Sequence, residues 1–305
     1  GTTIPLLLLM IIKSTMALAS VRVTPSHKII LVTGSNKGIG YEIARKISVI
    51  KGDDETAFVC ILGCRSEERG RKAVEKLRAE GHNVDFCKID LEDKDSITSA
   101  AAYIEKTYGR CDVLVNNAAV CFNDPTLYGK VPHIPFGEQA DITIRTNFFG
   151  TLALTEAMLP MLEKSEWGGR IINIASSAGR LSILPSQERR DAFSSETLEL
   201  EELKGYMKDF VKAAKDGNHQ VYGWPNTGYG VSKVGIIAMT KIFARKYPKM
   251  MVNSVDPGYC RTDQNANQGF VPPERGALTP FLLAAIHTSQ HVSGVHFYEE
   301  KPIVW

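Results

Sequence analysis

A tyrosine and a lysine lie four positions apart in the stretch TGYGVSK, from Thr227 to Lys233. In a helix this spacing places Tyr229 and Lys233 on the same face. A phenol beside a cation could deliver or accept a proton, because a nearby positive charge favours the phenolate and lowers the pKa of the phenol. Two ordinary residues on one helical face would show the same pattern, so the rest of the chain has to decide between these interpretations.

A glycine-rich turn, TGSNKGIG from Thr33 to Gly40, directly follows a strongly apolar segment. Glycines allow the backbone to approach a phosphate closely, and the N-terminus of the following helix offers free N–H groups. The first strand-to-helix turn is where dinucleotides bind in doubly wound α/β proteins, although a plain turn could carry the same glycines. The turn predicts a phosphate site formed by Gly34, Asn36, Lys37, Gly38, Ile39 and Gly40.

The next apolar segment ends in GCRSEE, which places a basic residue at a position important for cofactor choice. Proteins that prefer NAD commonly carry an acid here that holds the ribose hydroxyls, whereas this chain has Arg65. Arg65 and Lys37 could pair with a 2′-phosphate. The alternative is that both are solvated surface charges. The sequence therefore favours NADP(H) as the cofactor.

Short apolar segments typical of buried strands alternate with amphipathic segments typical of helices. The expected strands lie at 28–33, 57–63, 83–89, 112–118, 169–176 and 250–255. The expected helices lie at 39–50, 66–80, 93–108, 139–162 and 229–247. This alternation predicts the α/β class, with a doubly wound parallel sheet of the Rossmann type and helices on both faces.

The alternation is interrupted before the tyrosine by an interval of 53 positions, from 176 to 229. We expect a helical insertion at about 178–227, within a single domain that spans 25–305. A helix in this interval is indicated by apolar residues that recur at helical spacing on one face. These residues are Leu203, Tyr206, Met207, Phe210, Val211 and Ala214.

Residues 1–24 are expected to be a leader or a disordered segment. The run IPLLLLMII has the length of a signal-peptide core, and Ala17 to Ala19 resembles a cleavage site. However, the first basic residue, Lys13, follows the apolar run, and the run is too short to cross a bilayer. We expect a cytoplasmic protein, with secretory or organellar targeting as the alternative if residues 1–20 are a genuine targeting segment.

Composition favours a small-molecule partner. The 36 Lys and Arg residues nearly balance the 34 Asp and Glu residues, so nothing points to nucleic acid. The six cysteines include no C-x-x-C pair, and this spacing indicates reduced thiols. His287 and His291 form an H-x-x-x-H pair, but no acidic third ligand follows at zinc-enzyme spacing. We therefore expect no metal, no nucleic acid and no membrane among the partners.

Four motifs now stand in order along the chain: the glycine-rich turn, NNAA at 116–119, the serine of INIASS, and YGVSK. From about Lys28 to its end, the chain resembles the short-chain dehydrogenase/reductase family. The stretches GWPNTGYGVSK and VDPGYCRTD, with the long interval before Tyr229, resemble its monomeric carbonyl reductase branch. Ala119 departs from the glycine that is commoner in the family, a change that we do not expect to prevent cofactor binding.

The resemblance implies residue roles and an oligomeric state. It implies that the catalytic residues are Asn147, Ser176, Tyr229 and Lys233. The catalytic serine of the family lies three positions after the asparagine of INIAS, which indicates Ser176 and not Ser177. The further cofactor positions that it implies are Asp90, Leu91 and Asn116 on the adenosine side, and Pro257, Gly258, Thr262, Tyr229 and Lys233 on the nicotinamide side. It also implies a monomer, since in this branch the insertion covers the surface that other members use to form tetramers.

The implied activity is NADPH-dependent reduction of ketones, aldehydes or quinones to alcohols or hydroquinones. Tyr229 would donate the proton, with its pKa lowered by Lys233, and Ser176 would hydrogen-bond the substrate oxygen as charge develops there. Asn147 would hold a water that feeds protons to Lys233. Apolar walls for a ring-bearing ketone or quinone are expected from Trp224, Tyr259 and Phe270.

Two other functions remain open. The first is an NADP-dependent alcohol dehydrogenase that acts mainly in the oxidative direction. The second is a nucleotide-binding regulator that has kept the fold without catalysis, since a fold alone does not establish an activity.

Overall fold

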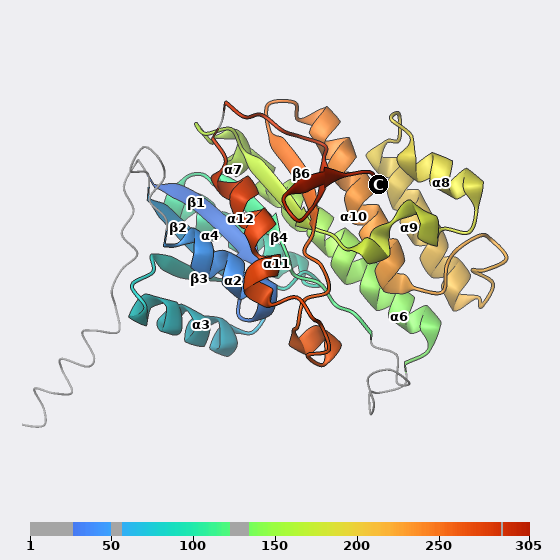
Figure 1. Cartoon of the computed structure of the whole chain (residues 1–305), viewed down its shortest axis with the longest axis horizontal. Coiled ribbons are helices and arrows are strands. Elements are labelled where there is room, and N and C mark those ends of the chain that lie inside the picture. The colour runs from blue at the N-terminus through green and yellow to red at the C-terminus, as the bar shows by residue number, and fades with distance from the viewer. Residues whose placement is uncertain (1–26, 50–56, 123–133, 288) are drawn as a thin grey trace, which may run out of the picture.

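The computed structural model describes residues 27–49, 57–122, 134–287 and 289–305. Each strand expected from the sequence is present, with its ends shifted by a few residues (Figure 1). The strands are β1 (Lys28–Thr33), β2 (Phe58–Cys64), β3 (Val84–Lys88), β4 (Val113–Asn116), β5 (Arg170–Ile174), β6 (Met251–Asp256), β7 (His296–Tyr298) and β8 (Lys301–Ile303). The last two strands were not expected, because three residues are too few to show a hydrophobic period.

The strands form one sheet in the order β3-β2-β1-β4-β5-β6-β7-β8. All neighbouring strands are parallel except β7 and β8, which pair antiparallel. The chain builds one half of the sheet outward from β1 to β3 and then returns to β4 on the other side of β1. The strand order reverses between β1 and β4, and the crevice at the carboxyl ends of such strands is where open α/β sheets bind ligands. The predicted Rossmann-type fold is therefore confirmed.

Helices cover both faces of the sheet, because each buried strand directs alternate side chains to opposite sides. On β1, Ile29 and Leu31 belong to the core under one helical layer, and Ile30 and Val32 belong to the core under the other. The first layer contains α4 (Lys94–Tyr108), α7 (Thr151–Glu163) and α10 (Gly228–Lys246). The second contains α2 (Gly38–Ile47), α3 (Glu67–Ala79) and α12 (Leu278–Ala285).

The start of α3 is as predicted from the sequence. The side chain of Ser66 caps the helix by accepting a hydrogen bond from the Arg69 backbone N–H at 3.3 Å. Glu67 and Glu68 lie in the first turn, where the helix dipole favours negative charge. The helix therefore begins directly after the end of β2 and holds the residues between them in a short, ordered turn.

The helical segment at 136–163 differs from the single helix that was expected. It consists of α6 (Phe136–Thr143), a π-helical stretch η2 (Ile144–Gly150) and α7. A π-helix has one more residue in each hydrogen-bonded turn than an α-helix, so it rotates the side chains that follow it. Apolar periodicity does not reveal such a local change, because the residues on either side continue the helical pattern.

The inserted segment folds into α8 (Gln187–Ser194) and α9 (Leu200–Lys215), which lie at the end of the molecule farthest from α3 (Figure 1). The predicted apolar face of α9 is confirmed. Leu203, Met207, Phe210 and Ala214 are buried, while Tyr206 and Val211 are partly buried against the same core. The insertion packs on α6 and α10 and so extends the core of the domain.

Trp224 was expected to form a wall of the substrate site, and that expectation is wrong. The side chain is only 1% exposed and packs against the rings of Phe193 and Phe210. The guanidinium of Arg189 lies 3.7 Å from the centroid of the indole. Trp224 is therefore part of the core that joins the insertion to the rest of the domain.

His296 on β7 is a buried histidine. Its burial should make the stability of the folded protein depend on pH. It is 5% exposed, its Nδ1 lies 2.9 Å from Ser254 Oγ, and burial lowers its pKa from 6.5 to about 4. The unfolded chain takes up a proton near pH 6.5 that the folded protein does not bind until near pH 4. As the pH decreases from 6.5 to 4, the contribution of His296 should therefore lower the free energy of unfolding by up to about 3 kcal/mol.

His296→Gln should remove this component, so that the free energy of unfolding depends less steeply on pH between 6.5 and 4. Chemical denaturation at a series of pH values measures the slope. His291→Gln changes an exposed histidine and is the matched control, with a slope like that of the wild type. Identical slopes for the wild type and His296→Gln would contradict the prediction.

Candidate active site

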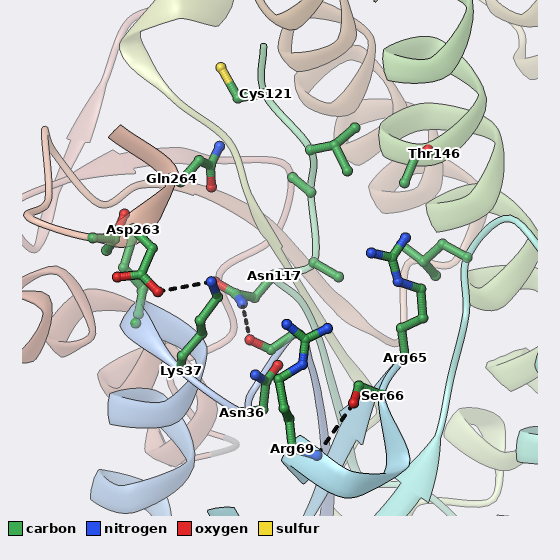
Figure 2. A pocket seen from close by; sticks show the side chains of 18 of the residues that line it. Asn36, Lys37, Arg65, Ser66, Arg69, Asn117, Cys121, Thr146, Asp263 and Gln264 are labelled. Carbon is green, nitrogen blue, oxygen red and sulfur yellow. Dashed lines mark hydrogen bonds and ion pairs between the residues drawn. The ribbon is translucent and has the colours of Figure 1, made fainter. Parts of the chain in front are cut away.

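A cavity of about 570 Å³ opens at the carboxyl ends of β1, β2 and β4 (Figure 2). The glycine-rich turn and the N-terminus of α2 form one part of its wall. The segment that follows β2 and the segment that follows β4 form two others, and residues 261–267 close the side opposite Arg65. This position is the reversal point of the strand order, and the volume is typical of a cofactor or ligand site.

The glycine-rich turn requires glycine for both conformation and space. Gly34 has a φ of +64°, and a Cβ there would lie 2.9 Å from the Cα of Ala118. A Cβ on Gly40 would lie 2.4 Å from Nδ2 of Asn117, which itself donates to the Thr33 carbonyl oxygen at 2.9 Å. The turn is thus packed directly against the segment after β4, with no room for a side chain at Gly34 or Gly40.

The N-terminus of α2 is suited to an anion. The N-cap residue Lys37 makes no side-chain capping hydrogen bond, and the first turn of α2 carries no acidic residue. The first N–H groups of a helix have no intrahelical acceptor, and the helix dipole favours negative charge at this end. A glycine cradle at such a helix start fits the pyrophosphate of a dinucleotide.

Three basic side chains line the cavity beside this turn: Lys37, Arg65 and Arg69 (Figure 2). Lys37 Nζ pairs with Asp263 Oδ2 at 2.9 Å, across the cavity mouth. Arg65 Nη1 lies 4.0 Å from Glu92 Oε2, which leaves its guanidinium weakly held. Lys37 and Arg65 were predicted from the sequence but Arg69 was not, although it follows Arg65 by only four residues in the same segment.

Nine of the predicted cofactor residues line the cavity: Gly34, Asn36, Lys37, Gly38, Ile39, Arg65, Asp90, Leu91 and Thr262. Asn116 does not, because its side chain is buried in the sheet and donates to Thr155 Oγ1 at 3.0 Å and Asn173 Oδ1 at 2.9 Å. The wall begins one residue later, at Asn117. The lining also lacks Gly40, Tyr229, Lys233, Pro257 and Gly258, and Gly40 packs beneath the turn.

The four predicted catalytic side chains come from three different parts of the fold, which brings them together. Tyr229 and Lys233 lie in the first two turns of α10, which Thr227 caps by accepting from the Gly230 N–H at 3.0 Å. Lys233 Nζ lies 5.4 Å from the ring centroid of Tyr229 and donates to the Ile174 carbonyl oxygen at 2.6 Å. Ser176, just after β5, hydrogen-bonds the Tyr229 side chain.

Asn147 lies in the middle of the π-helical stretch and joins two elements. Its Nδ2 donates to the Val120 carbonyl oxygen at 2.9 Å and to Ser232 Oγ at 3.1 Å. Its Oδ1 accepts from the Val120 N–H at 2.8 Å. The side chain therefore ties the segment after β4 to α10 beside Lys233. The proposed role of Asn147 in holding a water stays a prediction.

The electrostatics of the pair differ from the sequence-based expectation. Burial raises the pKa of Tyr229, and hydrogen bonds with Ser176 and Gln264 only partly oppose this effect. Burial also lowers the pKa of Lys233 to about 8. Desolvation is the largest cause of both shifts, because both groups are enclosed by the protein. Tyr229 thus remains a protonated phenol at neutral pH, while Lys233 titrates near that range.

Two further side chains at the site were missed from the sequence. Gln264 lies on the short 3-10 helix η5 (Asp263–Asn265) and hydrogen-bonds the side chains of both Tyr229 and Cys121. Figure 2 shows Gln264 and Cys121 near each other at one end of the cavity. The amide of Gln264 thus offers a donor and an acceptor beside the phenol.

The other two predicted apolar walls lie at the surface. Tyr259 is 41% exposed and Phe270 is 76% exposed, with their rings 5.7 Å apart in an edge-to-face arrangement. They flank the segment that carries Thr262 and Gln264 but do not line the cavity itself. Their contact with a substrate stays a prediction.

The described residues contain neither a metal-binding cluster nor a membrane-spanning helix. Among them, no cluster of three or more His, Cys, Asp and Glu side chains is arranged to hold a metal ion. Across the same ranges, no helix has both the length and the apolar character needed to cross a membrane. All six cysteines are free thiols.

Solved structures of plant enzymes share this fold. Salutaridine reductase from Papaver somniferum is 29% identical, with a TM-score of 0.78 over 89% of this chain and 99% of that one. Menthone neomenthol reductase from Mentha piperita is 28% identical, with a TM-score of 0.77 over 90% of this chain and 99% of that one.

Sequence comparison agrees with the fold. "Carbonyl reductase [NADPH] 1" of Bos taurus is 38% identical over 286 residues, which cover 92% of this chain and 98% of the relative. A family model described as short chain dehydrogenase matches residues 28–185. This range includes the glycine-rich turn, the cavity walls after β2 and β4, and Ser176. The chain therefore belongs to the short-chain dehydrogenase family of oxidoreductases.

Proposed function

We propose that this protein reduces small ketones, aldehydes or quinones with NADPH. The observation that carries the proposal is the placement of a protonated, buried Tyr229 beside Lys233 and Ser176, next to a cavity with a basic rim. The names of its relatives support it, since one is a carbonyl reductase that uses NADPH and two are plant reductases.

NADP(H) is the proposed cofactor, because the cavity offers groups suited to its pyrophosphate and to its 2′-phosphate. The glycine-rich turn and the N-terminus of α2 would hold the pyrophosphate. Arg65, Arg69 and Lys37 would surround a 2′-phosphate, where guanidinium groups bind phosphate in a bidentate manner. Asp90, Leu91 and Thr262 would contact the rest of the molecule. When bound, NADPH supplies the hydride.

The residues of the chain would supply the proton and orient the carbonyl. Tyr229 donates its hydroxyl proton to the substrate oxygen, and Ser176 donates a hydrogen bond to the same oxygen as negative charge develops. Lys233, whose pKa of about 8 allows exchange near neutral pH, returns a proton to Tyr229, and it would also hold the nicotinamide ribose of a bound cofactor. Asn147 holds α10 in place through Ser232.

The experiment that tests the proposal measures NADPH oxidation by the wild-type protein with a panel of carbonyl compounds. The panel contains quinones, aromatic ketones, aldehydes, and terpenoid and steroid ketones. Turnover of at least one class, faster with NADPH than with NADH, is the expected result. NADPH binding without turnover of any class would favour the non-catalytic regulator, and faster alcohol oxidation than ketone reduction at neutral pH would favour the dehydrogenase.

We also propose that the protein is a monomer. The insertion helix α9 packs on α6 and α10 and so covers part of the helical layer with residues of the same chain. Light scattering should give the mass of one chain. A mass near that of four chains would contradict the proposal.

The thiols support a cytoplasmic location for the protein. Five of the six cysteines are buried and all are free, which is typical of proteins from a reducing compartment. Cys60 and Cys111 are fully buried in the sheet, and burial raises the pKa of both thiols. They are therefore packing residues and not reactive groups.

A further inference from the structure

Trp305, two residues after β8, makes a hydrogen bond that the proposed mechanism does not use. Its indole Nε1 donates to the Gly179 carbonyl oxygen at 2.7 Å, although the two residues lie 126 positions apart. The ring is partly buried against the core of the first helical layer, and Lys241 Nζ on α10 lies 5.6 Å from its centroid. Trp305 therefore joins α10 to the segment after β5 (Figure 1, where C marks this end of the chain).

The segment that Trp305 reaches is the 3-10 helix η3 (Ser177–Gly179), whose N-cap is Ser176. The Ala178 N–H donates to Ser176 Oγ at 3.1 Å, and the Gly179 N–H donates to the Ser176 carbonyl oxygen at 2.8 Å. Residues 176–179 thus form a closed turn, the serine turn. An acceptor position of the Ser176 hydroxyl is filled from the backbone, which leaves the proton of the hydroxyl for donation to a substrate.

The serine turn packs against the start of α10 without space for side chains at the contact. A Cβ on Gly179 would lie 2.7 Å from the carbonyl carbon of Lys233. A Cβ on Gly230 would lie 2.9 Å from the Ala178 carbonyl oxygen. The turn and the helix thus meet directly at these two glycines. A tilt of the serine turn would therefore move Ser176 relative to the helix that carries the proton-transfer pair.

In the proposed reaction, the placement of the Ser176 hydroxyl matters most in the transition state. Its hydrogen bond to the substrate oxygen strengthens as negative charge develops there, so a displaced donor loses stabilisation mainly at that stage. Residues 176–179 do not line the cofactor cavity. A displaced serine turn should therefore lower kcat and leave KM and the affinity for NADPH almost unchanged.

We propose that Trp305 is a positioning residue of this active site: by donating to Gly179 it holds the serine turn on α10 and so fixes the hydroxyl of Ser176. The inference rests on the proposed function, since that function assigns Ser176 its role. Trp305 is itself absent from the lining of the cofactor cavity, so it acts through the turn and not through the cofactor.

The test is a double-mutant cycle on carbonyl reduction with the wild type, Trp305→Phe, Ser176→Ala and the double variant. Trp305→Phe removes the N–H and keeps an aromatic ring beside Lys241. Its kcat should be about 3- to 10-fold below that of the wild type, which is the effect expected from one lost hydrogen bond. In the Ser176→Ala background the same substitution should have almost no further effect, because the hydroxyl that it positions is gone.

Single-turnover rates with protein in excess keep the Ser176→Ala background measurable, since loss of one such donor costs about 10²- to 10³-fold. KM, NADPH affinity and thermal midpoint are measured for each variant. Trp167→Phe is the matched control. It makes the same change at a partly buried tryptophan that lies over Lys28, the first residue of β1, and it should leave kcat unchanged.

Two results would overturn the role of Trp305. One is an unchanged kcat in Trp305→Phe, and the other is an equal loss of kcat with and without the Ser176 hydroxyl. A role in stability alone would lower the thermal midpoint without this dependence on Ser176. Absence of any carbonyl reduction by the wild type would instead refute the proposed function, and it would be seen before any variant is compared.

Discussion

Tyr229→Phe should lose nearly all carbonyl reduction while it still binds NADPH. The substitution removes only the hydroxyl and leaves the ring in place over Lys233. Proton transfer by a positioned side chain typically contributes about 10²- to 10⁴-fold to a rate, so kcat should fall by that factor. Burial keeps the phenol protonated at neutral pH, and Ser176 hydrogen-bonds this side chain.

Two measurements separate this prediction from a general loss of structure. Steady-state rates give kcat, and fluorescence titration gives the affinity for NADPH, which should stay within a few-fold of the wild type. Tyr222→Phe removes the hydroxyl of an exposed tyrosine in the insertion and should retain full activity. Wild-type turnover in Tyr229→Phe would show that the proton comes from elsewhere.

Arg65→Glu should weaken NADPH binding by about 10- to 100-fold and change NADH binding little. A charge-assisted hydrogen bond to phosphate is worth about 1.5 to 3 kcal/mol. NADH has no 2′-phosphate, so its binding does not depend on this hydrogen bond. The Arg65 side chain is 62% exposed, so solvent screening places the effect within this range and not above it. The introduced carboxylate also repels the 2′-phosphate.

The dissociation constants of both cofactors are measured for Arg65→Glu and for a control. Arg71→Glu reverses the same charge on α3, where Arg71 pairs with Glu67 and does not line the cavity. It should affect both cofactors slightly and equally. If Arg65→Glu also weakened NADPH and NADH by the same factor, the 2′-phosphate contact would be refuted.

Local patterns in the sequence were sufficient for the fold. The apolar runs of β1 and β2 and the amphipathic periods of α3 and α9 are properties of a few consecutive residues, and the structure has each element where it was expected. The glycine-rich turn was recognisable for the same reason, because the φ of Gly34 and the crowding at Gly40 constrain the residue type directly. The short strands β7 and β8 had no such local signal.

Only part of the candidate active site could be predicted from such local patterns in the sequence. The spacing of Tyr229 and Lys233 follows from one helix, but their approach to Ser176 depends on the pairing of β5 with β6 and the packing of α10. Arg69 and Gln264 join the cavity from segments almost 200 positions apart. Such contacts leave no periodic trace in the sequence.

The sequence by itself therefore determined the order of elements, the phosphate turn and the residue types of the proton-transfer pair. The tertiary structure decided how deeply each group is buried. Burial placed Trp224 in the core of the insertion and raised the pKa of Tyr229, which had been expected to fall. Desolvation depends on every residue that surrounds a group, and those residues are brought together only by the folded chain.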